Sequence, residues 1–149
     1  MDHNIIASNS SDGIDLFGLT SPLTIGSNDL SGNYVAGINN IAGIAVNAAG
    51  NWWGSASGPR NPTNTFNVQS QGPEAGSNVT FAPWLNSGGN SAAIGFSPTG
   101  ATMAPVTTTS PASSFSSIQA AINASAPGAT VTAITGTYTS RWSFPRFSP

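Results

Sequence analysis

Short alternations of apolar and polar residues, separated by asparagine and glycine, dominate the first 50 residues. The segments "IDLF" (14–17), "LTI" (23–25) and "GINNIAGIAV" (37–46) contain the two-residue period of strands that bury one face. Asparagine and glycine between them mark turns. The pattern therefore predicts several very short strands joined by tight corners, each roughly three to five residues long at the usual rise of a strand.

These alternations recur at a nearly constant spacing. "NII" (4–6), "NDL" (28–30) and "NWW" (51–53) are separated by 24 and 23 residues, and the match continues from Ile14 to Ile38. A repeat of this length, built from short strands and Asn- and Gly-rich corners, is typical of one coil of a parallel β-helix. Chance similarity in a sequence rich in asparagine, glycine and isoleucine is the alternative.

The repeat predicts which side chains stack. Ile6, Leu30 and Trp53 hold the same position in successive repeats, so we expect all three to point inward. Asparagines at equivalent corners can adopt left-handed backbone and bond their amides to the coil above. The regular pattern then breaks at Gly54, because "GSASGPRNP" (54–62) contains too much glycine and proline to continue a strand.

Two tryptophan motifs carry a family resemblance. "NWWGSASGP" (51–59), followed by "VTFAPWL" (79–85), resembles the ending of right-handed parallel β-helix domains of the pectin-lyase-like superfamily, which occurs in secreted and surface proteins of bacteria and archaea. The resemblance implies an all-β fold, a right-handed parallel β-helix of about three coils with a C-terminal cap, over residues 1–85. The matching residues are Asn51, Trp52, Trp53, Gly54, Gly58, Pro59, Pro83, Trp84 and Leu85.

The remaining residues divide into three further segments. Residues 86–114, rich in Gly, Ser, Thr and Pro, read as a linker with a short strand around 93–96. In the segment 115–140, Phe115, Ile118 and Ile122 have helical spacing.

Serine at 116 or 117 can cap the start of this helix, and Pro127-Gly128 ends it. "SIQAAINAS" followed by "PGATVTAITGTYT" resembles the opening of the same superfamily, so the segment is expected to begin a second β-helix. The alternative is that the helix folds back onto the exposed end of the first. The tail at 141–149 is irregular and reads as a truncation, a shifted reading frame or a fragment of a longer chain.

Composition narrows the partners and the compartment. Only 5% of residues are charged, the net charge is -2, and there is no cysteine. Without a basic patch we expect no nucleic-acid partner, and without an apolar run of about 20 residues we expect no membrane span. Abundant hydroxyl and amide side chains are common in extracellular repeat proteins. We therefore expect a secreted or cell-surface protein whose export signal lies upstream of this chain.

Few residues offer catalytic chemistry. Asp12 and Asp15 lie close together in "SDGID" (11–15) and are the candidate cation ligands, although their spacing matches no calcium loop. The alternative is a turn at Asp12-Gly13 with a solvated Asp15. We assign no catalytic residue and no cofactor. Trp52 and Trp84 are the candidate carbohydrate-binding residues, although core and cap roles for them are favoured.

The sequence thus favours a non-catalytic structural or adhesive β-helix segment of a larger extracellular or cell-surface protein. Its partner would be a glycan or polysaccharide, and the exposed N-terminal coil end predicts self-association. The alternative is a fragment of a carbohydrate-active enzyme, a polysaccharide lyase or hydrolase, whose catalytic coils lie outside this chain.

Overall fold

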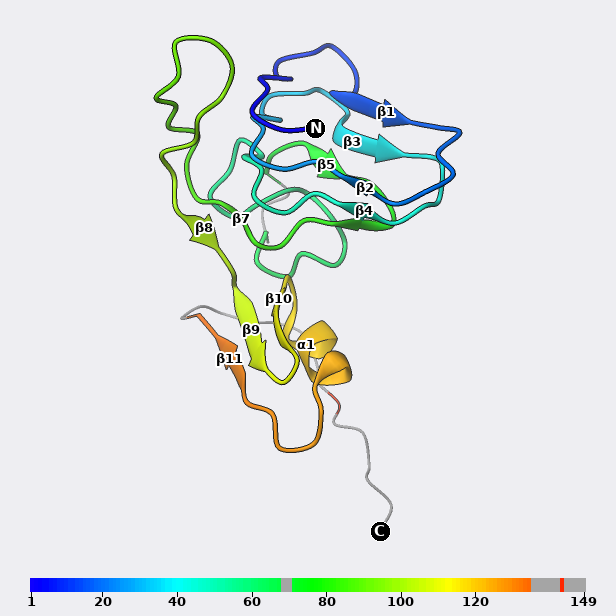
Figure 1. Ribbon diagram of the computed structural model, residues 1–149, viewed down its shortest axis with the longest axis vertical. Helices are drawn as coiled ribbons and strands as arrows, with labels where there is room; N and C mark the ends of the chain where they lie inside the picture. Colours follow the sequence, from blue (N-terminus) through cyan, green and yellow to red (C-terminus); the bar gives the residue numbers. More distant parts are fainter. Residues whose placement is uncertain (68–70, 135–142, 144–149) are drawn as a thin grey trace.

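The computed structural model describes residues 1–67, 71–134 and 143, which contain short strands and one helix (Figure 1). The parallel sheets lie at one end of the molecule, and the β9–β11 sheet with α1 lies at the other. The strands are β1 (Ile14–Leu16), β2 (Leu23–Thr24), β3 (Ala36–Asn40), β4 (Val46–Asn47), β5 (Glu74–Ala75), β6 (Val79–Thr80), β7 (Trp84–Leu85), β8 (Thr102–Met103), β9 (Val106–Thr109), β10 (Ala112–Phe115) and β11 (Val131–Ala133), and α1 spans Ile118–Ala124.

Equivalent positions of successive repeats pair in three columns. The first column is the parallel sheet β1-β3-β5, and the second is the parallel sheet β2-β4-β6. The third consists of single bridges that join Ile5 to Asp29 and Asp29 to Trp52, continued by β7 and β8. The registers match the spacing in the sequence, with Ile14 opposite Ile38.

The predicted right-handed parallel β-helix of about three coils is nevertheless wrong. The described residues form separate sheets of two or three strands, most of them two to five residues long, without a closed or solenoid sheet. Two causes are visible. The insertion 54–73 interrupts the third repeat between Trp53 and β5. After β5 and β6 have joined their columns in parallel, the described strands β7 to β11 pair only antiparallel, β7 with β8 and β9 with β10 and β11.

The core lies between the three columns. Leu30 and Trp53 are fully buried, and Ile6 is partly buried and packs against the same cluster. Trp53 needs a glycine opposite its ring, because a Cβ atom on Gly37 would lie 2.8 Å from Trp53 Cζ3. The three side chains that the repeat aligned therefore share one core.

Two stacks of asparagine side chains hold the corners together. Asn28 Oδ1 accepts the backbone N–H of Asn4 at 2.9 Å and its side-chain amide at 3.0 Å. Asn51 Oδ1 accepts the same two groups of Asn28 at 2.9 and 3.0 Å. Asn33 does the same for Asn9, at 3.1 and 2.8 Å. The amide nitrogens of Asn28, Asn33 and Asn51 donate to backbone carbonyls at the corners.

Left-handed backbone occurs next to these asparagines and not at them. His3, Ser27 and Gly50, which directly precede the first three stacked asparagines, have φ of 59°, 56° and 75°. Ser8 and Gly32 precede the other stack with φ of 59° and 67°. The preceding residue turns the chain, which leaves the asparagine free to point its amide along the stack. We expected left-handed backbone at the corner asparagines themselves, but in these stacks the residue before each asparagine adopts it.

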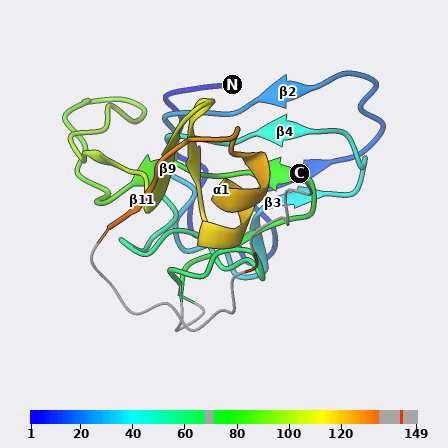
Figure 2. The ribbon, with the colours of Figure 1, turned by 90° about the horizontal axis from the view of Figure 1, so that it is seen from below.

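The second part of the molecule is an antiparallel sheet covered by the helix. β9 pairs with β10 on one side and with β11 on the other, and α1 packs on this sheet (Figure 2). The predicted cap is confirmed at Ser117, whose hydroxyl accepts the backbone N–H of Ala120 at 3.2 Å.

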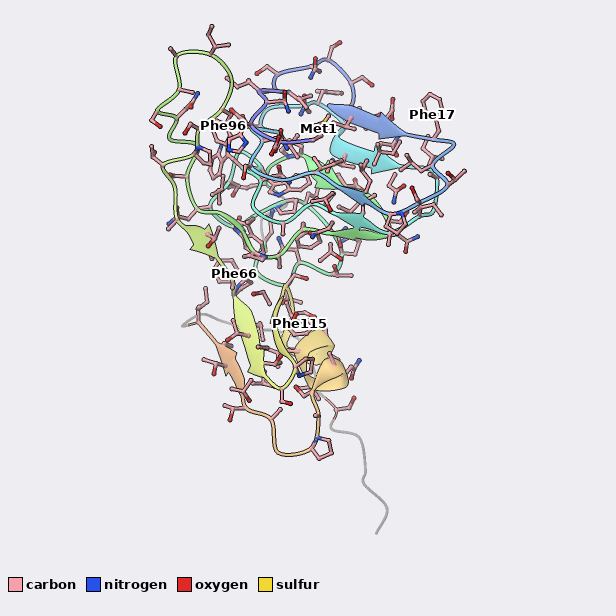
Figure 3. All side chains as sticks on the ribbon, in the orientation of Figure 1. Met1, Phe17, Phe66, Phe96 and Phe115 are labelled. Carbon is pink, nitrogen blue, oxygen red and sulfur yellow. The ribbon has the colours of Figure 1, made fainter. Side chains whose placement is uncertain are left out.

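This unit also contacts the first part of the chain. Thr65 Oγ1 donates to Ser116 O at 3.1 Å, and Ser116 Oγ donates to Thr63 O at 3.2 Å. Phe66 lies between the two parts (Figure 3) and packs on Trp84 with ring centroids 6.2 Å apart.

The sheet beside α1 contains residues of both the predicted linker and the predicted second β-helix. β8, β9 and most of β10 fall within 86–114, whereas residues 93–96 form no strand. The antiparallel pairing of β11 differs from the first strand of a parallel solenoid. The end of the 115–140 unit and the tail at 141–149 lie outside the described residues, Ser143 apart. The domain boundaries stay a prediction.

Replacing Asn28 with alanine should destabilise the fold strongly. The change leaves the backbone N–H of Asn4 and the Gly26 carbonyl without their partners, which costs about 2 kcal/mol of unfolding free energy. Urea denaturation measures the loss. The exposed Asn86, whose side chain makes no hydrogen bond in the described part of the chain, is the control: Asn86→Ala should change the value by less than about 0.5 kcal/mol. Equal effects of the two substitutions would contradict the role of the stack.

Candidate functional site

Asp12 and Asp15 are brought together by Asn39. The Asn39 amide nitrogen donates to Asp15 Oδ1 at 2.9 Å and to Asp12 Oδ2 at 3.3 Å. The pairing of β1 with β3 places Asp15 opposite Asn39 and so fixes this contact. Asp15 is exposed, while Asp12 Oδ1 is buried and has no hydrogen-bond partner in the described structure.

The carboxylates of Asp12 and Asp15 are two side chains that could contribute ligands to a calcium ion. Calcium takes six to eight oxygen ligands, and within the described residues no three acidic or histidine side chains cluster together. Asn39 could add its amide oxygen as a third ligand only if its side-chain amide turned over, because its nitrogen now faces both carboxylates. The role of Asp12 and Asp15 as cation ligands stays a prediction.

The two candidate carbohydrate-binding tryptophans have different surroundings. Trp84 is fully buried, and its indole N–H donates to Ala56 O at 3.0 Å, so its ring has no face on which a sugar could stack. Trp52 is half-buried and points out of the core. The backbone of Gly88 lies directly over the indole, because a Cβ there would be 2.4 Å from Trp52 Nε1.

The other residues of the tryptophan motifs have structural contacts. Asn51 ends one asparagine stack, and Trp53 fills the core. Gly54 and Gly58 have φ of 76° and 79°, and a Cβ on Gly58 would lie 2.7 Å from the Trp84 ring. Pro59 is fully buried.

Pro83 and Leu85 of the second motif form backbone hydrogen bonds with the corner around Asn51. Pro83 O accepts the backbone N–H of Gly50 at 2.7 Å, and the backbone N–H of Leu85 donates to Asn51 O at 2.9 Å. The motif "APWL" (82–85) therefore joins the third column.

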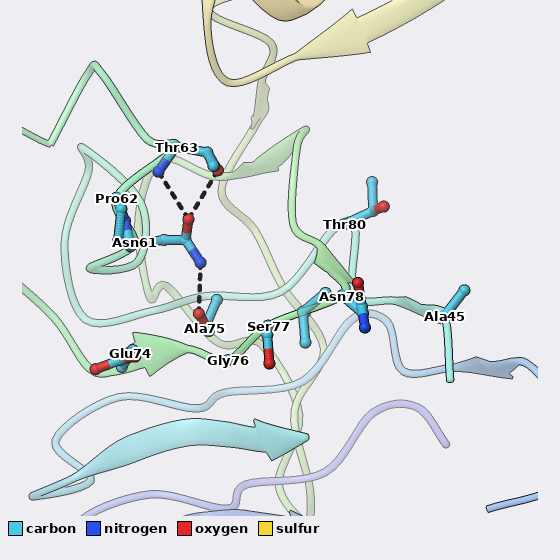
Figure 4. Close-up of a pocket in the computed structure, with 11 residues that line it drawn as sticks. Ala45, Asn61, Pro62, Thr63, Glu74, Ala75, Gly76, Ser77, Asn78 and Thr80 are labelled. Carbon is cyan, nitrogen blue, oxygen red and sulfur yellow. Dashed lines mark hydrogen bonds between the residues drawn. The ribbon is translucent and has the colours of Figure 1, made fainter. Parts of the chain in front are cut away.

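A hollow that was not predicted lies between the segment that contains β5 and β6 and the loop 61–63 (Figure 4). It has a volume of about 670 Å³, with Glu74 to Thr80 on one side and the loop 61–63 on the other. Asn61 shapes this loop: its side-chain oxygen accepts the N–H and hydroxyl of Thr63 at 2.9 and 2.7 Å, and its amide donates to Ala75 O at 2.6 Å.

The hollow is walled mainly by neutral groups. Arg60 lies beside Glu74 with 3.6 Å between the guanidinium and carboxylate, and the same guanidinium nitrogen donates to Val35 O at 2.9 Å. Hydroxyls, amides and backbone line the rest. Sequence reasoning missed the hollow because its walls come from an insertion without periodic pattern; the Asn-Pro-Thr turn at 61–63 was the one local signal.

No protein-family model, curated protein or solved structure matches this chain. The resemblance of the tryptophan motifs to the pectin-lyase-like superfamily therefore stays a prediction. In the described part of the chain, no helix has the length and apolar character needed to cross a membrane.

Replacing Asn39 with aspartate should make stability depend on calcium. Three neighbouring carboxylates would repel each other by roughly 1 kcal/mol per close pair in water, and calcium would relieve that repulsion. The melting temperature of Asn39→Asp should thus fall without calcium and recover when calcium chloride is added. Asn39→Ala is the matched control, which loses the same hydrogen bonds and should not respond. An unresponsive Asn39→Asp would mean that the carboxylates cannot share one ion.

Proposed function

We propose that this chain is a non-catalytic structural and adhesive module of a secreted or cell-surface protein. The single observation that carries the proposal is the pair of asparagine stacks. The Asn-rich repeat, which is the most distinctive feature of the sequence, is used for hydrogen bonds between repeats. The Trp motifs likewise contribute Trp53 and Trp84 to the hydrophobic core.

The charged groups support the same proposal, because their contacts are structural. Asp29 Oδ1 accepts the backbone N–H of Ser31 at 2.9 Å within its own corner. Arg60 bridges Glu74 and the carbonyl of Val35. A hydrolase or lyase needs an acid, a base and a charge stabiliser within reach of one substrate. Asp29 lies in the third column and the Arg60–Glu74 pair in the first, and each holds its own turn.

The adhesive ligand in this proposal is a weakly held glycan at Trp52. Trp52 keeps part of its surface exposed, whereas Trp84 is enclosed. A large aromatic surface beside exposed backbone and hydroxyl groups suits a sugar ring, which has apolar C–H faces and polar edges.

Binding and turnover of polysaccharides test the function. The purified chain should be retarded in a gel that contains a neutral polysaccharide and should release no products from neutral or acidic polymers, with or without calcium. Trp52→Ala should remove the retardation, because the stacking surface is lost, while Tyr34→Ala, at a remote aromatic that is 81% exposed, should not. Product formation that disappears in Asp12→Ala or Asp15→Ala would establish the enzyme instead.

Self-association through the N-terminal edge is the second part of the proposal. Among the described strands, none pairs with the outer edges of β1 and β2, and Ile5, in the same first repeat, is 54% exposed. Unpaired strand edges with apolar side chains promote association, and a lysine placed there opposes it.

We therefore expect concentration-dependent dimers in sedimentation velocity, shifted to monomer by Ile5→Lys. The control is Ile94→Lys, since Ile94 is 96% exposed on the loop between β7 and β8. A wild-type chain that stays monomeric at all concentrations would contradict this part.

A further inference from the structure

The three columns end, after their last strands β5, β6 and β7, in different ways, and we call these their lower ends. In the first column, the segment at Arg60 pairs in parallel with Glu74 of β5. The Arg60 N–H donates to Pro73 O at 3.2 Å, and the Ala75 N–H donates to Arg60 O at 3.1 Å. In the third column, β8 pairs with β7. The second column ends at β6, and no other strand of the described residues lies beside it.

The backbone of Val79 faces the uncovered side of β6. The carbonyls of Asn78 and Thr80 point toward β4, since they accept the N–H groups of Val46 and Ala48 at 2.9 and 2.7 Å. Carbonyls alternate in direction along a strand, so the N–H and C=O of Val79 point away from β4. Val79 also lines the hollow under β6 although its side chain belongs to the core, as expected of backbone at a sheet edge.

Two hollows adjoin each other along this edge. The hollow of about 670 Å³ shares Thr63, Val79 and Thr80 with a second one of about 160 Å³, which lies against β10 and the start of α1. The rings of Phe81 and Phe115 form part of the lining of this second hollow. Together they form a groove that follows β6 and ends at the helical unit, and we call it the β6 groove.

We propose that the β6 groove binds an extended polypeptide segment of a partner protein, which adds to β2-β4-β6 as a fourth strand. The chain covers the equivalent edges of β5 and β7 with its own segments, so strand pairing is how this fold completes a column. Main-chain hydrogen bonds to Val79 supply the affinity, as in other cases of strand addition.

The groove also defines the chemistry of that segment. Alternate side chains of an added strand point to opposite faces, so one of them enters the second hollow at Phe81 and Phe115. Toward the other end, the segment passes Ser77, Asn78 and the half-exposed carboxylate of Glu74. A suitable segment is therefore extended, with a β-branched apolar residue at one end and hydroxyl or basic residues at the other.

Amide hydrogen exchange of the full chain tests the proposal. The probe is a blocked peptide of alternating threonine and valine with one terminal lysine. At a peptide concentration about ten times its Kd, exchange of the Val79 amide should slow about tenfold. The Val46 amide, already bonded to Asn78 O, should not change. Absence of binding, or protection spread evenly over the chain, would overturn the proposal.

A matched pair of variants locates the peptide. Thr80 and Thr24 are both exposed and occupy the same register of the second column, at its lower and upper edges. Thr80→Arg should fill the groove and weaken peptide binding at least about tenfold, whereas Thr24→Arg should leave it unchanged. If Thr80→Arg does not fold, Thr63→Arg blocks the groove from its opposite wall.

Other occupants give distinct results, each of which would overturn the proposal. A neutral hexasaccharide that protects the Val79 amide when the peptide does not would make the groove a glycan site. Dimerisation abolished by Thr24→Arg and by Thr80→Arg alike would mean that β2 of a second copy occupies the edge of β6.

Discussion

The hydrogen bond that an asparagine side-chain oxygen accepts from the backbone N–H of the preceding repeat is the interaction on which the rest of this structure depends. Most strands of the parallel columns contain only two or three residues, too few for their ladders alone to fix the register. Asn28 solves this problem by accepting two hydrogen bonds from Asn4 and donating to corner carbonyls. Because the Asn28 side chain is fully buried, it would carry a desolvation cost if left unpaired.

The turn chemistry and the core both follow from those stacks. A left-handed residue before each stacked asparagine, such as Ser27, directs the amide along the column. With the corners fixed, Leu30 and Trp53 meet inside the three columns, and Gly37 gives the large ring its space. The insertion after Trp53 ends this regularity, and its loop at 61–63 leaves the hollow under β6.

The uneven ending of the columns connects the fold with its proposed interactions. Chain segments cover the lower edges of β5 and β7, while no described strand pairs with the upper edges of β1 and β2 or the lower edge of β6. Open edges in a chain with very few charges are sites where other strands can pair. The strand pairing that we propose at these edges agrees with the proposed structural and adhesive function.

The sequence by itself determined the local features of this protein. The spacing of "NII", "NDL" and "NWW" located the stacked asparagines and the shared inward positions of Ile6, Leu30 and Trp53, because these contacts repeat between equivalent residues. A helix cap at Ser116 or Ser117 was predictable for the same reason, and the structure selects Ser117, three residues before its N–H partner Ala120.

Only the tertiary structure decided how the repeats end. The antiparallel pairing of β9 with both β10 and β11, and the burial of Trp84 beneath the insertion, join segments that share no pattern. Pairing direction and burial depend on which distant segment covers a strand edge or a ring. An apolar motif indicates only that something must cover it. For this reason the predicted β-helix was wrong although its repeat was read correctly, and the β6 groove could not be foreseen.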